Sequence, residues 1–221
     1  MRKQERATRT RHALIRSAAR QFVRQGYAQA RLVEISAGAG VSAGALHFHF
    51  ESKAAVADAV RGEAGRLLRE AAALARERQP RALQALVDMS HILGQLLRED
   101  VVVQAGYQLD CDPSATAGGA ELHEEWLECV DRMLAAAASE GVLGPGVDRG
   151  DLVTVVVSAT IGLEALGRHD GTWLLRSSLT GFWRWMLPSV ATPQALPGLC
   201  PQGDDLVLSA SGRPVAGLMT P

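Results

Sequence analysis

The side chains best suited to contact phosphates or base edges are gathered in the first quarter of this 221-residue chain. Residues 1–53 hold ten Arg and Lys side chains against three Glu, a net charge of +7, while the other 13 basic and 21 acidic residues give −8. A basic end on an otherwise acidic protein is what binding of a polyanion by one end requires. The pattern therefore favours recognition of nucleic acid over catalysis.

Two short helices joined by a tight turn are predicted within residues 32–53, LVEISAGAGVSAGALHFHFESK. The first spans Leu32–Ala39, and Gly40 can adopt the left-handed conformation that ends a helix. Ser42 is a good N-cap for the second helix, Ala43–Phe50. This arrangement predicts a helix-turn-helix whose second helix enters a DNA major groove.

The outward face of this motif supplies the predicted DNA contacts. Those near bases are Ser42, Ala43, Gly44 and His47, and those at phosphates are Arg31, His49 and Lys53. For Gly44 and His49 the alternative is that they serve only packing. An expected sign of base readout is that His47→Ala changes sequence preference while Lys53→Ala weakens binding to every sequence.

Helical apolar spacing continues along the chain and predicts an all-α fold of nine helices. Beyond the two above, they are Thr8–Gln25, Lys53–Glu77, Arg81–Arg98, Val101–Leu109, Glu121–Glu140, Asp151–Leu166 and Thr172–Leu187, the last one stopped by Pro188. The predicted domains are a DNA-binding head (1–52), a ligand-binding and dimerisation body (53–188) and a Pro/Gly-rich, poorly ordered tail (189–221). Residues 1–10 read as a polar arm.

Three cysteines without metal-ligand spacing fit reduced cytosolic thiols. The basic N-terminus is followed by no apolar segment of a signal peptide, and no charge-free run of 18 apolar residues indicates a membrane span. We therefore expect a cytoplasmic, nucleoid-associated protein with no membrane partner and no cofactor.

The segment ISAGAGVSAGALHFHFESK resembles the signature of TetR-type repressors. The shared positions are Ile35, Ala39, Gly40, Val41, Ser42, Gly44, Leu46, His49, Phe50, Ser52 and Lys53. The resemblance implies an Ω-shaped homodimer with two DNA-reading heads and a ligand pocket in each body. The last two of the nine predicted helices, Asp151–Leu166 and Thr172–Leu187, are the natural dimer interface. GALHFHF and the Glu125-Trp126 pair further resemble the γ-butyrolactone receptors of actinomycetes, which implies a repressor released by a small lactone, butenolide or furan and controlling antibiotic production.

Four positions depart from the family pattern. Ala30 and Arg31 replace threonines that would cap the second helix, at a typical loss of ~1 kcal/mol, although Arg31 can offer a phosphate a charged contact instead. His47 replaces a tyrosine, and Ala43 stands where related receptors often carry lysine. The operator sequence therefore cannot be copied from relatives.

The ligand pocket is expected among the five predicted helices from Lys53–Glu77 to Asp151–Leu166, with Trp126 as a flat apolar wall. Gln104, Tyr107 and Thr160 are the candidate polar partners, and Leu93 and Val130 the candidate lining; core packing is the alternative for each. A regulator that answers to an antibiotic or intermediate instead of a lactone stays open. An enzyme or metal sensor would have to use Asp110, Cys111, Asp112, His123, Glu124 and Glu125, whose spacing matches no nucleophile or ligand motif.

Overall fold

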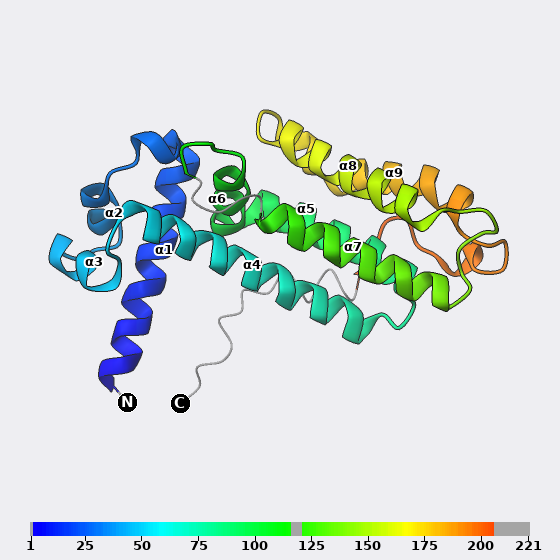
Figure 1. Ribbon diagram of the computed structural model, residues 1–221, viewed down its shortest axis with the longest axis horizontal. Helices are drawn as coiled ribbons and strands as arrows, with labels where there is room; N and C mark the ends of the chain where they lie inside the picture. The colour runs from blue at the N-terminus through cyan, green and yellow to red at the C-terminus, as the bar shows by residue number, and fades with distance from the viewer. Residues whose placement is uncertain (1, 116–120, 206–221) are drawn as a thin grey trace. The chain divides into compact units, whose positions relative to one another are not determined.

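The computed structural model describes residues 2–115 and 121–205, and every regular element within these ranges is a helix. In order they are α1 (Arg2–Gln29), α2 (Leu32–Gly38), α3 (Ala43–His49), α4 (Lys53–Arg78), α5 (Ala82–Glu99), α6 (Val101–Asp110), α7 (Glu121–Ser139), α8 (Arg149–Gly167), the 3-10 turn η1 (Gly171–Leu174), α9 (Arg176–Val190) and η2 (Leu196–Gly198). Figure 1 traces them along the chain. The predicted all-α fold is confirmed.

The described residues up to Leu67 pack with Asp100–Glu124 into one compact unit, here called unit 1. An apolar stripe of α1 forms its core, because Leu14, Ile15, Ala18, Ala19 and Phe22 are all buried. This stripe faces α2 and α6. The buried Ser17 hydroxyl donates to the carbonyl of Ile35 at 2.8 Å, which ties α2 to α1. The helix-turn-helix is thus held on α1.

Leu68–Glu99 and the described residues from Glu125 onward form unit 2. Its centre is α5, which is buried over most of its length and contacts α8, η1 and α9. Trp183 of α9 is fully buried, and its Nε1 donates to the Ser90 hydroxyl at 2.7 Å. A buried indole N–H needs such a partner, so this bond fixes α9 against α5.

The two compact units do not follow the predicted boundary at residue 52. The packing divides α4 after Leu67 and α7 after Glu124, so each of these helices contributes residues to both units. The functional division into a DNA-binding head and a ligand-binding body stays a prediction.

Several predicted helix ends differ from the structure; the last helix, for example, is predicted from Thr172, whereas Thr172 lies in η1 and α9 begins at Arg176. The first helix begins at Arg2, not Thr8, because neither glycine nor proline interrupts the residues before it. Pro188 does not end α9, which continues to Val190. A proline interrupts one helical hydrogen bond, and here it lies exposed in the last turn, where water can satisfy the freed carbonyl.

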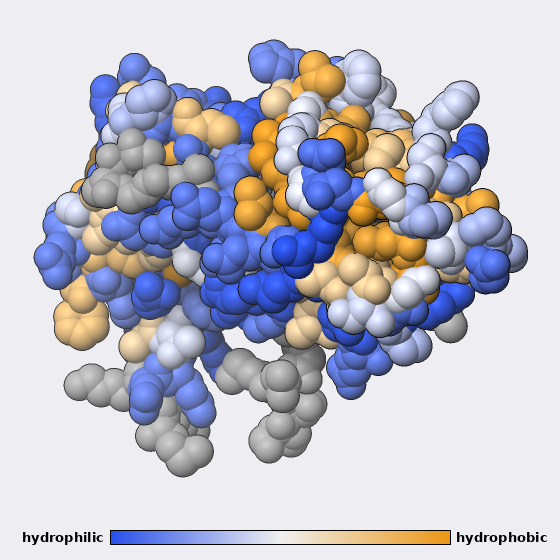
Figure 2. Space-filling view, turned by 45° about the vertical axis from the view of Figure 1, so that its right-hand side comes forward, coloured by the Kyte–Doolittle hydropathy of each residue, from blue (hydrophilic) through white to orange (hydrophobic). Residues whose placement is uncertain are grey.

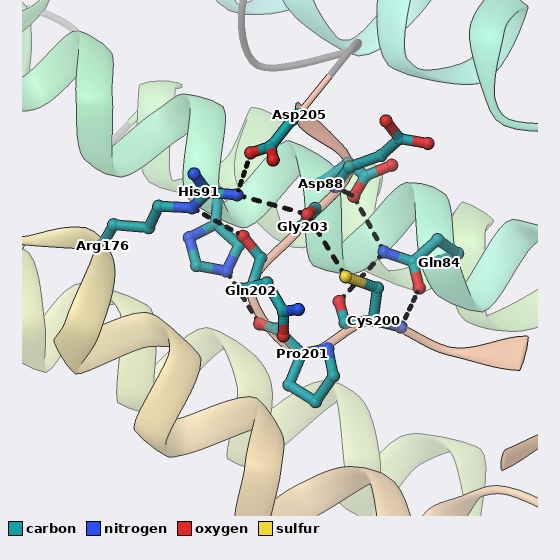
Figure 3. Close-up of polar contacts among 10 residues, drawn as sticks. Gln84, Asp88, His91, Arg176, Cys200, Pro201, Gln202, Gly203 and Asp205 are labelled. Carbon is teal, nitrogen blue, oxygen red and sulfur yellow. Dashed lines mark hydrogen bonds and ion pairs between the residues drawn. The ribbon is translucent and has the colours of Figure 1, made fainter. Parts of the chain in front are cut away.

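The prediction of a poorly ordered tail for 189–221 is wrong as far as residue 205, and 206–221 lie outside the described residues. Leu143 and Ala191 form an isolated antiparallel bridge. The segment Cys200–Asp205, the C-terminal strap, lies along α5 (Figure 3). There Gln84 makes two hydrogen bonds with strap backbone, at 2.7 and 3.2 Å, and Asp88 accepts a strap N–H at 2.8 Å.

The strap covers two titratable side chains of α5. Burial raises the pKa of Asp88 and lowers the pKa of His91. Nε2 of His91 is 2.9 Å from the carbonyl oxygen of Pro201, so that nitrogen carries the proton in this contact. On the α9 side, Arg176 Nε donates to the carbonyl of Gln202 at 2.8 Å. The strap therefore joins α5 to the start of α9.

Candidate nucleic-acid interface and ligand pocket

The turn between α2 and α3 forms as its residue types predict. Gly40 has a φ of 69°, the left-handed conformation that glycine adopts without strain. The Ser42 hydroxyl accepts the N–H of Ala45 at 3.2 Å and so caps α3. Leu46 and Phe50 are buried four residues apart. One face of α3 is thereby anchored, and the other is left to solvent.

The free face of α3 carries three of the predicted base contacts, since Ala43, Gly44 and His47 are all exposed. A Cβ on Gly44 would meet no atom closer than 3.9 Å, so packing within the described protein does not require a glycine there. Phe48 is 82% exposed on the same face and is absent from the predicted DNA contacts. The sequence pattern indicates this exposure, because Phe48 lies one helical turn after Gly44 and therefore projects from the same face of α3.

Arg31 stands exposed at the N-cap position of α2, and its side chain makes no capping hydrogen bond. The expected loss of the cap is therefore present in the structure. A guanidinium free of the helix end remains available for a phosphate, which is the role predicted for it.

Lys53 has a different setting from the one predicted. Its half-buried Nζ donates to the carbonyls of Tyr27, Ala28 and Ala30 at 2.8, 3.1 and 3.2 Å, and lies 4.4 Å from the Tyr27 ring centroid. An ammonium has three donors, and these three carbonyls use them all. A phosphate contact by Lys53 would have to replace one of these bonds.

His49 is half-buried between two aromatic rings. Its ring meets that of Phe48 edge-on with centroids 5.2 Å apart, and the ring of Phe50 at 6.5 Å. The geometry suits the packing alternative for His49, and a phosphate contact remains a prediction.

Unit 2 contains a cavity of about 180 Å³ between α4 and α7. Its lining consists of Leu68, Arg69, Ala72, Met89, Glu125, Trp126, Glu128, Cys129 and Arg132. Apolar side chains lie beside two arginines and two glutamates, and Arg69 pairs with Glu125. Burial raises the pKa of the Cys129 thiol, so the wall at that point is neutral.

Trp126, the leading ligand candidate, lines this cavity and is 3% exposed. Its Nε1 donates to the hydroxyl of Thr160 at 2.7 Å, and that hydroxyl lies 2.8 Å from the carbonyl of Val156. The structure thus brings two predicted residues together, but Thr160 orients the indole and does not line the cavity. Leu93 and Val130 are buried in unit 2 outside the lining.

Gln104 and Tyr107 lie on α6 in unit 1, whereas the other four ligand candidates lie in unit 2. Tyr107 is 1% exposed, and its ring meets that of His123 with centroids 5.0 Å apart. Beside them, buried Asp110 accepts the N–H of Leu122 at 2.8 Å and caps the first turn of α7. This part of the predicted pocket forms a buried polar core in unit 1.

The groups proposed for an enzyme or metal sensor are structural where their contacts are known. Asp110 pairs with buried Arg61, with Nε and Oδ1 3.5 Å apart, and Nδ1 of His123 lies 3.5 Å from the same carboxylate. In residues 2–115 and 121–205, no three His, Cys, Asp or Glu side chains stand close enough to hold a metal ion.

Comparison with known proteins places this arrangement in a family. The profile of the tetR family of bacterial regulatory proteins matches residues 14–60. The A-factor receptor protein of Streptomyces griseus is 31% identical over 204 residues, covering 92% of this chain and 71% of that protein. The chain belongs to the TetR family of bacterial regulatory proteins.

Two solved structures resemble the chain along most of its length. The crystal structure of a gamma-butyrolactone receptor, an ArpA-like protein, matches with a TM-score of 0.72 at 25% identity, covering 87% of this chain and 93% of that one. CprB of Streptomyces coelicolor, in complex with its biological operator sequence, matches with a TM-score of 0.70 at 25% identity, covering 93% and 96%. Both predicted resemblances, to TetR regulators and to γ-butyrolactone receptors, are confirmed.

The family defines the class of protein. It is a DNA-binding transcriptional regulator and not an enzyme. Regulators of this kind are soluble cytoplasmic proteins that bind operator DNA and small molecules.

Proposed function

We propose that this protein is a repressor that binds a pseudo-palindromic operator as a homodimer and leaves it when a small lactone, butenolide or furan signal enters unit 2. The genes under its control are expected to belong to antibiotic biosynthesis. The observation that carries the DNA-binding part is the free face of α3 in a segment of net charge +7. The likeness to the A-factor receptor protein supports the ligand class.

The dimer is proposed to form through α8 and α9. Five large apolar side chains between the start of α8 and the end of α9 are exposed in the single chain: Val155, Leu166, Trp173, Leu175 and Trp185. In the right-hand half of Figure 2, hydrophobic residues gather over the helices of unit 2. Burying such residues against a second copy would be favourable by ~25 cal/mol per Å² of apolar surface.

Among the described residues, α8 is also the one helix long and apolar enough to cross a membrane, with a mean hydropathy of 1.4. A helix in a dimer interface has the same composition, and α8 carries charged residues at its start and a buried Glu164 bonded to Arg168 at 2.6 Å. We therefore assign its apolar face to a partner subunit and not to lipid.

Ligand release is proposed to start at the cavity beside Trp126. Ligand pockets commonly measure ~300–1,000 Å³, so we expect a cavity of about 180 Å³ to enlarge when a ligand enters. Enlargement would separate α4 from α7. A ligand that favours the enlarged state shifts the population away from the DNA-competent one by its differential affinity for the two.

The charged side chains at the cavity favour one second candidate. Arg69, Glu125, Glu128 and Arg132 could hold a ligand that is itself charged, such as an antibiotic intermediate with a carboxylate or amine. Replacing Arg69 and Arg132 by glutamine should abolish the response to an effector with a carboxylate and spare the response to a neutral lactone.

The test selects duplexes from a randomised pool with the purified protein and then measures their release by gel shift against a panel of lactones, butenolides, furans and antibiotic intermediates. Trp126→Phe should bind DNA normally but respond more weakly to effector, because it keeps an aromatic side chain but loses the N–H that fixes the orientation of the indole. Leu127→Ala, at an exposed neighbour outside the cavity lining, is the matched control. An unchanged response of Trp126→Phe to every active compound would exclude that residue from the ligand site.

A further inference from the structure

Phe48 is a large apolar side chain left in water at the centre of the DNA-facing surface. It is 82% exposed, while its helical neighbours Leu46 and Phe50 are buried. At 100° per residue, residues 44 and 48 project almost directly away from the direction of Leu46. The stripe that faces farthest from the core of unit 1 is therefore Gly44 and Phe48.

The ring of Phe48 is held by a neighbour. The half-buried ring of His49 meets it edge-on with centroids 5.2 Å apart, and His49 in turn lies 6.5 Å from the buried ring of Phe50. Edge-to-face pairs of this kind contribute beyond the area they bury. Contact with His49 therefore favours one orientation of an otherwise solvent-exposed side chain.

The surface around Phe48 offers little polar readout. Ala43 and Gly44 carry no side-chain donor or acceptor, and His47 is the one exposed polar side chain within α3 before His49. A Cβ on Gly44 would touch nothing within 3.9 Å, so this side of α3 can approach a groove closely. An apolar, closely approaching surface discriminates bases by methyl contact better than by hydrogen bonds.

We propose that Phe48 determines operator specificity by contacting the C5-methyl group of a thymine in each half-site. Thymine is the one base that presents a methyl group in the major groove, and phenylalanine is among the side chains that contact it. The inference rests on the proposed binding of operator DNA, and it adds the base that one side chain reads.

The experiment replaces each thymine of a selected duplex, one symmetric pair at a time, by deoxyuridine, which lacks only that methyl group. Affinity is measured by fluorescence anisotropy for the wild type, Phe48→Ala, His47→Ala and Val33→Ala. Val33 is the matched control, because it is an apolar residue of unit 1 that is 63% exposed but lies on α2. Circular dichroism checks that each variant keeps its helix content.

At one pair of positions, deoxyuridine should lower the affinity of the wild type about fourfold per half-site, or about 15-fold for both half-sites. This is the factor expected from one methylene-sized group. Phe48→Ala should bind the thymine duplex about as weakly as the wild type binds the deoxyuridine duplex. Deoxyuridine should cause it no further loss of affinity. His47→Ala and Val33→Ala should keep the full loss.

Two results would overturn the proposal: a wild type indifferent to deoxyuridine at every position, or a loss that persists unchanged in Phe48→Ala. Either result would leave operator binding itself intact. Failure of the selection to enrich any sequence would instead refute the proposed repressor function, and the inference with it.

Discussion

Replacing Lys53 by methionine should destabilise unit 1 and leave the number of phosphate contacts unchanged. The Lys53 ammonium donates to the carbonyls of Tyr27, Ala28 and Ala30 between 2.8 and 3.2 Å. It thereby joins the first residue of α4 to the end of α1 and the residue just after it. Methionine keeps the apolar stem and removes every one of these bonds.

The size of the effect follows from those contacts. A hydrogen bond to a charged group contributes ~1.5–3 kcal/mol, and an exposed cation–π contact ~0.5–1 kcal/mol. The three bonds share one ammonium, and water can satisfy the freed carbonyls because the site is only half-buried. We therefore expect a loss of ~2–4 kcal/mol, well below the sum of the separate values.

Urea unfolding followed by circular dichroism measures this loss. With a slope of ~2 kcal/mol per molar, the midpoint should fall by about 1–2 M. Binding to a selected duplex is then measured as a function of salt. The slope should match the wild type, since no phosphate contact is removed.

Arg31→Met provides the control, because Arg31 is exposed and makes no capping bond. It should leave the urea midpoint unchanged and reduce the salt slope by ~0.9 for each half-site, or ~1.8 for the dimer, the value for one phosphate contact per subunit. The reasoning fails if Lys53→Met instead behaves like this control, with an unchanged midpoint and the shallower slope.

Three further predictions concern packing, capping and protonation. Gly106→Ala should destabilise the protein by ~1–3 kcal/mol, because its methyl group would lie 2.7–2.8 Å from side chains of α4 and α7. Gly62→Ala, which meets nothing within 4 Å, should instead stabilise the protein by ~1 kcal/mol. Equal shifts of the two variants in thermal unfolding would contradict this. Arg31→Thr should raise the free energy of unfolding by ~1 kcal/mol, because the threonine hydroxyl would supply the missing cap of α2. An unchanged melting temperature would show that the new hydroxyl does not cap the helix. Burial lowers the pKa of His91 below its ordinary 6.5, so the unfolded state binds more protons below that pH and stability should fall as the pH drops through the folded-state pKa. His91→Gln should remove this decrease of stability with falling pH. The raised pKa of Asp88 has the opposite effect on stability, so an identical pH profile in the variant would assign the decrease to other groups.

The helix-turn-helix could be predicted in detail because each of its determinants is local. The left-handed Gly40, the caps at Ser42 and Ser52 and the buried pair Leu46 and Phe50 all act over at most four residues. Backbone sterics and helical spacing set such features without help from the rest of the chain. The family resemblance depended on the same short register.

Predictions failed where the deciding contact joins distant residues. The strap is held by a bond between Gln84 and Cys200, 116 positions apart, and a Pro- and Gly-rich composition gave no sign of it. Trp126 lines a cavity, and its partner Thr160, which is 34 residues away, serves to orient the indole. Ligand binding by either residue remains a prediction. Spacing along one helix cannot tell which distant element will cover it.

The sequence by itself determined the type of surface that is proposed to bind DNA: a basic segment carrying a short helix with one buried and one free face. The tertiary structure decided which side chains near that face are free. Lys53 donates to three carbonyls at the end of α1 and just after it, while Phe48, between two histidines in the sequence, is exposed to solvent. The difference arises because local spacing fixes a side chain's direction, whereas its availability depends on what the folded chain brings beside it.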